Sequence, residues 1–370
     1  MNLVLGARVP VARRNILADR RRLVTGVFGV GAAIALIFLL QSLWGGFQVQ
    51  LGSYAKNVGA QVFVGDLGTR TSWESSVVPL AAIDQIRAIP GVERADPIFL
   101  RSTILTLHAR KVFAALVGYE PGALGGPWRI SAGHGVQTAG EVVIDRTLAR
   151  QHDIGLGDAL EVQGARFRVV GLSDGTRTWM SAYVFVSREA AAGLYKTSGT
   201  ASFILVETTQ PAAVSARIAR EVALTPLEVR ELVRNDRKLI AAIMQGPIEL
   251  MVLIAFAAGT LIVALTVYSQ VVERVREYGI VKALGAGWKR LFAIVLGQTL
   301  VLAALGLIAG FGLSKAGGWL VIWLRPQFWL SLSGTQALQV VGAAAAMALL
   351  AAVVPTRRIA RLDPASVYRG

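Results

Sequence analysis

The residues that could do chemistry in this sequence are few and scattered. Residues 171–175 read GLSDG, which matches the G-x-S-x-G turn that presents a serine nucleophile in hydrolases. That turn needs a strand before it and a helix after it. Here the stretch TRTWMSAYVFV follows, which is typical of a loop and a strand. The pattern therefore favours a structural turn over a serine hydrolase.

Metal, acid–base and nucleotide chemistry find equally little support. His108, His134 and His152 have no H-E-x-x-H arrangement and no cysteine at ligand spacing, so we interpret them as surface or hydrogen-bonded side chains. Asp145 and Asp153 could pair, but carboxylates in a charge-balanced stretch are usually only solvated. No G-x-x-x-x-G-K-[ST] loop for nucleotide phosphates occurs. We expect no catalytic residue, no metal site and no cofactor in this chain.

The composition explains which elements the chain builds instead. Of 370 residues, 54% are apolar, 16% are charged and none is cysteine, which excludes disulfides and thiolate metal sites. Four windows without any charge lie at residues 23–55, 250–272, 291–314 and 326–356. Each holds the roughly 20 apolar residues needed to cross about 30 Å of hydrocarbon. We therefore predict four transmembrane helices, at residues 23–45, 247–272, 291–322 and 337–354.

The distribution of cations predicts the orientation of these helices. Lys and Arg are concentrated before the first window, between the second and third, and after the fourth. Short loops rich in Lys and Arg stay on the cytoplasmic side. Both termini and residues 273–290 are therefore expected on the cytoplasmic side of the membrane, and residues 46–246 and 323–336 on the other side. Residues 1–22 are predicted to lie in the membrane interface as a cytoplasmic amphipathic segment, followed by a retained anchor rather than a cleaved signal peptide.

The formal charge of +15 does not indicate a nucleic-acid partner. Residues 46–246 contain 21 Lys and Arg against 18 Asp and Glu, so most of the excess lies beside the membrane.

Strand patterns occur at residues 60–65, 102–109, 112–119, 141–145, 159–172 and 182–187, the fifth with a hairpin turn at Gln163-Gly164. Helical patterns lie between them, at residues 80–88, 146–152, 188–194 and 211–223. This mixture predicts an α+β extracytoplasmic domain inserted between the first two transmembrane helices.

Three details of the membrane segments carry separate expectations. Gly306 and Gly310 have the G-x-x-x-G spacing that allows close helix packing, although glycine enrichment common to membrane helices explains them equally well. Pro247 is interpreted as the outer boundary of the second helix or as a kink. Between the second and third helices, Gly285 and Gly287 would permit a bend, and Val281, Ala283 and Leu284 offer an apolar surface that a plain re-entry loop does not need.

Two motifs in this topology resemble a known family. REYGIVKALGA (residues 276–286) looks like the R-E-x-G-[IL]-x-[RK]-A-[LV]-G-A stretch of MacB/FtsX-type (type VII) ABC transporter permeases, which include DevC and LolC/LolE relatives. PTRRIARLDPASVYR (residues 355–369) is similar to the P-x-R-R-A-A-R-x-D-P ending of that family. IDQIRAIPGVERADPI (residues 83–98) and GEVVIDRTLARQHDIGLGDALEV (residues 140–162) resemble its periplasmic core domain, and ARRNILADRRRLVTGVFGV (residues 12–30) a DevC-like beginning.

The resemblance implies a function for the segment at residues 273–290. In that family the segment packs on a cytoplasmic ATPase as a coupling helix. By position, the contact and bend residues would be Arg276, Glu277, Gly279, Lys282, Ala283, Gly285 and Ala286. The cytoplasmic tail motif, within residues 355–370, would comprise Arg357, Arg358, Arg361, Asp363 and Pro364.

The resemblance also implies the partners. The chain would be the non-catalytic permease subunit of an ATP-driven exporter or of a lipid or lipoprotein extractor. ATP and Mg²⁺ would be bound by a separate ATPase subunit. A second copy or a paralogue would complete a permease dimer, and a membrane-fusion or other envelope protein could join it. The alternative is an FtsX-like transducer, in which ATPase cycling activates a cell-envelope hydrolase.

Overall fold

The computed structural model describes residues 20–107, 110–178, 182–326 and 328–360. The chain divides into a helical unit, residues 1–45, 246–324 and 330–370, and a mixed α/β unit, residues 46–245 and 325–329. The amphipathic segment expected at residues 1–22 lies outside the described residues except at its last three positions. Those positions begin the first described helix, α2 (Arg20–Gln50).

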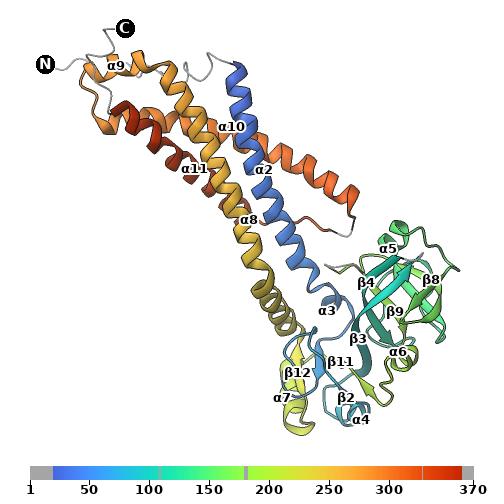
Figure 1. Cartoon of the computed structure of the whole chain (residues 1–370). Coiled ribbons are helices and arrows are strands. Elements are labelled where there is room, and N and C mark those ends of the chain that lie inside the picture. Colours follow the sequence, from blue (N-terminus) through green and yellow to red (C-terminus); the bar gives the residue numbers. More distant parts are fainter. Residues whose placement is uncertain (1–19, 108–109, 179–181, 327, 361–370) are drawn as a thin grey trace. The chain divides into compact units, whose positions relative to one another are not determined.

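Four helices are long and apolar enough to cross a membrane, which confirms the expectation of four transmembrane helices. They are α2, α8 (Val229–Glu273), α10 (Trp288–Leu324) and α11 (Gly334–Ala360) (Figure 1). At 45 residues, α8 begins well before the residue at which the second helix was expected to start. At 1.5 Å per residue it is about 68 Å long, more than twice the thickness of a hydrocarbon core. Pro247 thus lies inside a helix and does not mark its outer end.

Close contact between α2 and α10 depends on glycine. A Cβ added at Gly306 would lie 2.6 Å from the Cγ1 of Val30, and one added at Gly310 would lie 2.8 Å from the carbonyl oxygen of Gly31. Both distances are too short for a real side chain, so the two backbones approach here only because these positions lack one. Of the two explanations for the G-x-x-x-G spacing, close helix packing is the one observed.

The α/β unit is built on one large sheet. Its strands are β1 (Val62–Gly65), β3 (Arg94–Leu107), β4 (Arg110–Tyr119), β5 (Ile130–Gly133), β6 (Glu141–Asp145), β7 (Ala159–Val162), β8 (Ala165–Ser173), β9 (Tyr183–Ser187), β11 (Phe203–Glu207) and β12 (Thr225–Glu228). Their order is β12-β1-β11-β3-β4-β9-β6-β8-β5, and β7 pairs with both β3 and β8. Because of this double pairing, strands β3, β4, β9, β6, β8 and β7 form a closed ring. A separate two-stranded sheet joins β2 (Val78–Pro79) to β10 (Thr200–Ala201).

Short helices cover this sheet (Figure 1). They are α3 (Ser53–Asn57), α4 (Ala82–Arg87), α5 (Arg146–Gln151), α6 (Arg188–Tyr195) and α7 (Pro211–Glu221). The last four lie where helical patterns were expected. The hairpin between β7 and β8 is also where it was expected, and its two turn residues, Gln163 and Gly164, have φ of 51° and 84°. Positive φ at both central residues matches the right-handed twist of a two-residue hairpin. The α+β architecture between the first two membrane helices is therefore confirmed.

Five strands were not expected, namely β2, β5, β10, β11 and β12. The last two show why. Strand β11 is buried on both faces at its first four residues, so its sequence FILV shows no alternation of apolar and polar side chains. Strand β12 contains Pro226 and lies at the edge of the sheet. Proline has no amide hydrogen to donate, and an edge strand tolerates it because one side of the strand has no neighbour. Both strands pair with β1, the first strand of the unit.

Candidate functional site

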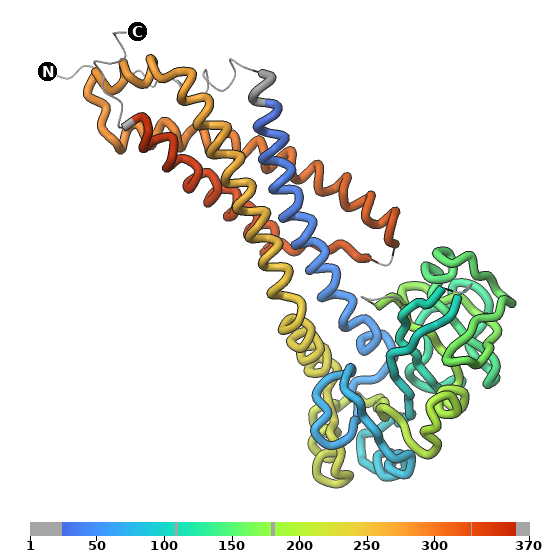
Figure 2. The backbone as a smooth tube through the Cα atoms, in the orientation of Figure 1, coloured from blue at the N-terminus to red at the C-terminus, as the bar shows by residue number. Residues whose placement is uncertain are grey.

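The segment between α8 and α10 forms a separate short helix, α9 (Val275–Ala283). Figure 2 shows the backbone turning from α8 through α9 into α10. The helix ends in a Schellman motif: the amide of Gly285 donates to the carbonyl of Lys282 at 2.9 Å, and the amide of Ala286 donates to the carbonyl of Val281 at 3.3 Å. This motif requires a left-handed residue, and Gly285 has φ of +87°.

Gly287 has a different position from the one expected. It has no positive φ, and its carbonyl accepts from the amides of Arg290 and Leu291 at 3.1 and 3.2 Å. Gly287 therefore lies directly before α10, which begins at Trp288. Of the two glycines, only Gly285 adopts the left-handed conformation that makes the bend.

A buried polar contact holds α9 against α10. The hydroxyl of Tyr278 lies 3.2 Å from the side-chain oxygen Oε1 of Gln298, to which it can donate. It also lies 3.0 Å from the side-chain nitrogen Nε2 of Gln298, which donates to it. Tyr278 is 4% exposed and Gln298 3%. Burial raises the pKa of Tyr278, so the phenol stays protonated and able to donate. The contact fixes which face of α9 is turned inward.

That orientation separates the residues that the family resemblance had grouped together. Gly279 and Ala286 are buried in the helical unit, and Lys282 is half-buried. Arg276, Glu277, Ala283 and Gly285 are exposed. Arg274, at the start of α9, lies 3.7 Å from the carboxylate of Glu277. Four of the seven expected residues thus lie on the open face, and two support it from inside.

Large apolar side chains are also exposed in α9, directly after it and at the start of α10. Ile280, Leu284 and Trp288 are 43%, 82% and 44% exposed, and we call these three residues the apolar edge of α9. Of the three expected apolar residues, Leu284 belongs to this edge and Ala283 lies beside it, whereas Val281 packs against the bundle core. Ile280 and Trp288 were missed because spacing alone does not tell which side of a short helix faces the protein.

The described part of the tail is tied to α8. The guanidinium of Arg358 donates a short hydrogen bond to the hydroxyl of Tyr268, and its carbon lies 5.1 Å from the centre of that ring. Arg357, its neighbour on α11, is exposed. Arg361, Asp363 and Pro364, the other expected tail residues, lie outside the described residues.

The GLSDG segment is structural. Ser173 is fully buried at the end of β8, and its hydroxyl lies 2.5 Å from that of Thr176. Asp145 accepts from the amide and hydroxyl of Thr176 at 3.0 and 2.9 Å, and with its other oxygen from the amide of Thr147 at 2.7 Å. The strand β9 follows, not a helix. Ser173 is buried and has no histidine in this network, whereas a nucleophilic serine needs an accessible hydroxyl and a neighbouring base. The network therefore stabilises a turn.

The histidines form no metal site in the described part of the chain. No group of three or more His, Asp or Glu side chains suited to a metal ion occurs there. His134 contacts the carbonyl oxygen of Gly135 through Nδ1 at 2.8 Å. Glu141 accepts from the amides of Gln137 and Thr138, and chiefly the first of these bonds lowers its pKa. His108 lies outside the described residues.

Comparisons with known proteins cover both units. Residues 249–364 match the family model described as FtsX-like permease C-terminal, and residues 23–221 match the MacB-like periplasmic core domain. Uncharacterized ABC transporter permeases of Mycobacterium bovis and Mycobacterium tuberculosis are 29% identical over 97% of this chain and 99% of their own length. Another from Mycobacterium tuberculosis is 27% identical over the same shares.

Two solved structures are similar to the α/β unit. The periplasmic region of MacB from Actinobacillus actinomycetemcomitans has 12% identity and a TM-score of 0.37. The extracellular domain of the noncanonic ABC-type transporter YknZ from Gram-positive bacteria has 13% identity and a TM-score of 0.33. Each match covers 48% of this chain and 94% of the other.

Proposed function

Since this chain belongs to the MacB/FtsX-type family of ABC transporter permeases, we propose that it couples a separate cytoplasmic ATPase to movement of its extracytoplasmic domain. Relatives matched over nearly their full length carry the name ABC transporter permease. In this proposal the chain is not itself catalytic, and ATP and Mg²⁺ are bound by the partner. A dimer with a second copy or a paralogue provides two coupling helices for two ATPase subunits.

The observation that carries the proposal is the apolar edge of α9. Ile280, Leu284 and Trp288 are exposed on a segment outside the uncharged windows, where Arg276 and Glu277 are exposed beside them. An apolar surface bordered by charged side chains is typical of a protein–protein contact and costs free energy when left in water.

The expected orientation of the chain in the membrane supports a cytoplasmic partner for α9. Arg274, Arg276, Lys282, Lys289 and Arg290 lie in or next to α9, and Arg357 and Arg358 lie near the end of α11. Loops with this density of cations are retained on the cytoplasmic side. In the proposed topology both termini and α9 are therefore cytoplasmic, in a bacterial inner membrane, and the α/β unit is outside.

In this proposal, movement of α9 passes to the membrane helices through the chain itself. Helix α8 runs without interruption from Val229 to Glu273 and is followed after one residue by α9. Displacement of α9 by a closing pair of ATPase subunits therefore acts on α8 through Arg274, and on α10 through the Tyr278–Gln298 contact. Both helices are long enough to carry that displacement across the membrane.

The test is assembly with an ABC ATPase from the same genome, beginning with those encoded beside this permease. The full chain is co-purified with the ATPase in detergent and reconstituted in nanodiscs, and ATP hydrolysis is measured with and without the permease. We expect Leu284→Asp to abolish co-purification and stimulated hydrolysis, because a charge placed in an apolar contact loses its hydration without gaining a partner.

Ser333→Asp is the matched control. Ser333 caps α11, where its hydroxyl accepts from the amide of Gln336 at 3.2 Å, and Asp is an equally good N-cap. The control adds the same charge at the opposite end of the helical unit and should leave assembly unchanged. If Leu284→Asp assembles like the control, or if no ATPase associates with the unaltered chain, the proposal fails.

A further inference from the structure

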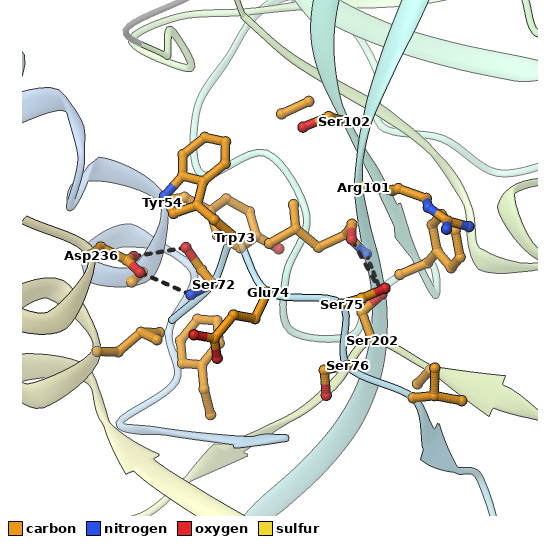
Figure 3. A pocket seen from close by; sticks show the side chains of 18 of the residues that line it. Tyr54, Ser72, Trp73, Glu74, Ser75, Ser76, Arg101, Ser102, Ser202 and Asp236 are labelled. Atoms are coloured by element: carbon orange, nitrogen blue, oxygen red, sulfur yellow. Dashed lines mark hydrogen bonds between the residues drawn. The ribbon is translucent and has the colours of Figure 1, made fainter. Parts of the chain in front are cut away.

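The α/β unit contains a cavity of about 380 Å³, a volume in the range of small-molecule sites. The start of α8, the 72–77 loop, α3 and the middle of β3 surround it, and every lining residue belongs to the α/β unit (Figure 3). Its walls combine aromatic and aliphatic side chains with nearly as many polar ones. Neither the coupling segment nor the tail contributes to it.

One wall presents a buried carboxylate. Asp236, in the first turns of α8, is 2% exposed and accepts from the amide and the hydroxyl of Ser72 at 2.9 and 2.7 Å. The exposed carboxylate of Glu74 lies in the same wall. In the described part of the chain no Lys or Arg side chain forms an ion pair with Asp236. Burying a charge without an opposite one is costly, so this wall is suited to a cation supplied from outside.

The adjoining walls are aromatic. The ring of Tyr183 lies 4.9 Å from that of Tyr54, which in turn contacts Phe63 edge-on at 6.5 Å. Phe63 and Tyr54 are buried. Aromatic faces beside a carboxylate bind the apolar body of an amine and attract its positive charge. Because of this combination, the ligand best suited here has a cationic end and an apolar body.

A third side of the cavity has unused hydrogen-bonding capacity. The hydroxyl of Thr197, after α6, is buried and has no hydrogen-bond partner among residues 20–107, 110–178, 182–326 and 328–360. Buried hydroxyl groups in native proteins nearly always have a partner, protein or solvent. Arg101 lies on the side of the cavity opposite Asp236 in Figure 3, with its guanidinium 5.0 Å from the ring of Tyr195.

We propose that this cavity binds a small primary amine with an aromatic or aliphatic body, whose ammonium group pairs with Asp236. The body of the ligand lies against Tyr54 and Tyr183. Glu74, which is exposed in the same wall, adds a second negative charge. The carboxylate is already held by Ser72, so the site is formed before the ligand arrives and its binding requires little reorganisation.

The chain contains no cysteine, so a single introduced thiol can report on the cavity. In the full chain in nanodiscs, Ser102→Cys places a thiol in the wall formed by β3. Its rate of alkylation by iodoacetamide is measured with 3-phenylpropylamine, 3-phenylpropan-1-ol or 3-phenylpropanoate present. We expect the amine to slow alkylation saturably, by about tenfold at ten times its Kd, and the alcohol and the acid to have little effect.

Two further variants make the result specific. Ser131→Cys, on β5 and outside the cavity, should be alkylated at the same rate with and without the amine. Asp236→Asn, combined with Ser102→Cys, should lose the protection, measured relative to the alkylation rate of the same double variant without amine. If Asp236→Asn does not fold, Glu74→Gln takes its place and should weaken the protection several-fold.

Three results would overturn the proposal. One is equal protection by the amine and the alcohol, which would show an apolar cavity without charge selection. Another is protection by the acid alone, which would assign the site to Arg101. The third is no protection by any of the three compounds. The outcome does not depend on whether an ATPase binds to α9.

Discussion

The hydroxyl of Tyr278 on α9 and the side-chain amide of Gln298 on α10 form a buried hydrogen-bonded pair, at 3.0 Å between the hydroxyl oxygen and the amide nitrogen. The hydroxyl of Tyr278 thus has its hydrogen-bond partner on the next helix. The pair joins the proposed coupling helix to a membrane helix through side chains as well as through the backbone.

Tyr278→Phe should leave the Gln298 amide buried without its partner and lower the free energy of unfolding by about 1–3 kcal/mol. Gln298→Leu should have a similar effect. The double variant should lose clearly less than the sum, because both polar groups are gone. Melting temperatures of the four purified proteins in one detergent test this. Strict additivity would show that the contact contributes nothing as a pair.

Gly285→Ala should weaken the turn after α9. Its φ of +87° is strained for any residue with a Cβ, which costs about 1 kcal/mol or more. Gly287→Ala is a matched control, since a Cβ there meets nothing within 4 Å and φ is not positive. We expect lower ATPase stimulation and a lower melting temperature for the first variant only. Equal effects of the two substitutions would contradict the assigned turn.

Gly310→Ala should destabilise the helical unit by forcing α2 and α10 apart. The added methyl would lie 2.8 Å from the carbonyl oxygen of Gly31 and 2.9 Å from the Cβ of Ile34, neither of which is a flexible side-chain end. Overpacking of this kind typically costs about 1–3 kcal/mol. Gly312→Ala, on the same helix with nothing within 4 Å, should be neutral or slightly stabilising. Thermal unfolding in detergent compares them, and a neutral Gly310→Ala would refute the close contact.

Asp236 predicts a pH dependence of stability. Burial is the largest influence and raises the pKa of Asp236 to about 6, with Glu74 adding to the rise and the two Ser72 bonds opposing it. The folded chain therefore binds more protons than the unfolded chain between roughly pH 4 and 6. Its stability should increase as the pH falls from 7.5 to 5. Relative to Asp236→Asn, the melting temperature of the unaltered chain should rise over this interval.

Glu141→Gln provides a comparison of opposite sign. Backbone hydrogen bonds hold the pKa of Glu141 below 4.5, so its stabilising effect is present above that pH and is lost only below it. Between pH 7.5 and 5 the difference between this variant and the unaltered chain should stay constant. A constant difference for Asp236→Asn as well would mean that Asp236 titrates near its usual value.

The sequence allows the membrane helices to be predicted because each is a long uncharged run, a signal carried by neighbouring residues. The same is true of the α5, α6 and α7 segments and of the β7–β8 hairpin, whose turn residues are adjacent in the chain. The start of α8 at Val229 was missed because Gly246 and Pro247 look like a boundary. The helix continues through Pro247, and on the other side of it Leu232, Val233 and Asp236 are buried in the α/β unit.

Long-range features were beyond such reasoning. The closure of β3 onto β7, and the meeting of Asp236 with Ser72 across 164 residues, depend on pairings that no local pattern contains. The segment between α8 and α10 shows the same limit at a shorter range. The motif contains Gly279 and Ala286, but only the packing of α9 against the helical unit shows that both residues are buried.

The antiparallel pairing of β1 with β12, in which Val62 lies opposite Glu228, has a consequence for biogenesis. The first and the last strand of the α/β unit are neighbours, so the sheet cannot be completed until the chain has been exported as far as Glu228. Strand β1 must therefore remain without either of its partner strands, β11 and β12, during translocation, a stage at which exposed strand edges favour aggregation.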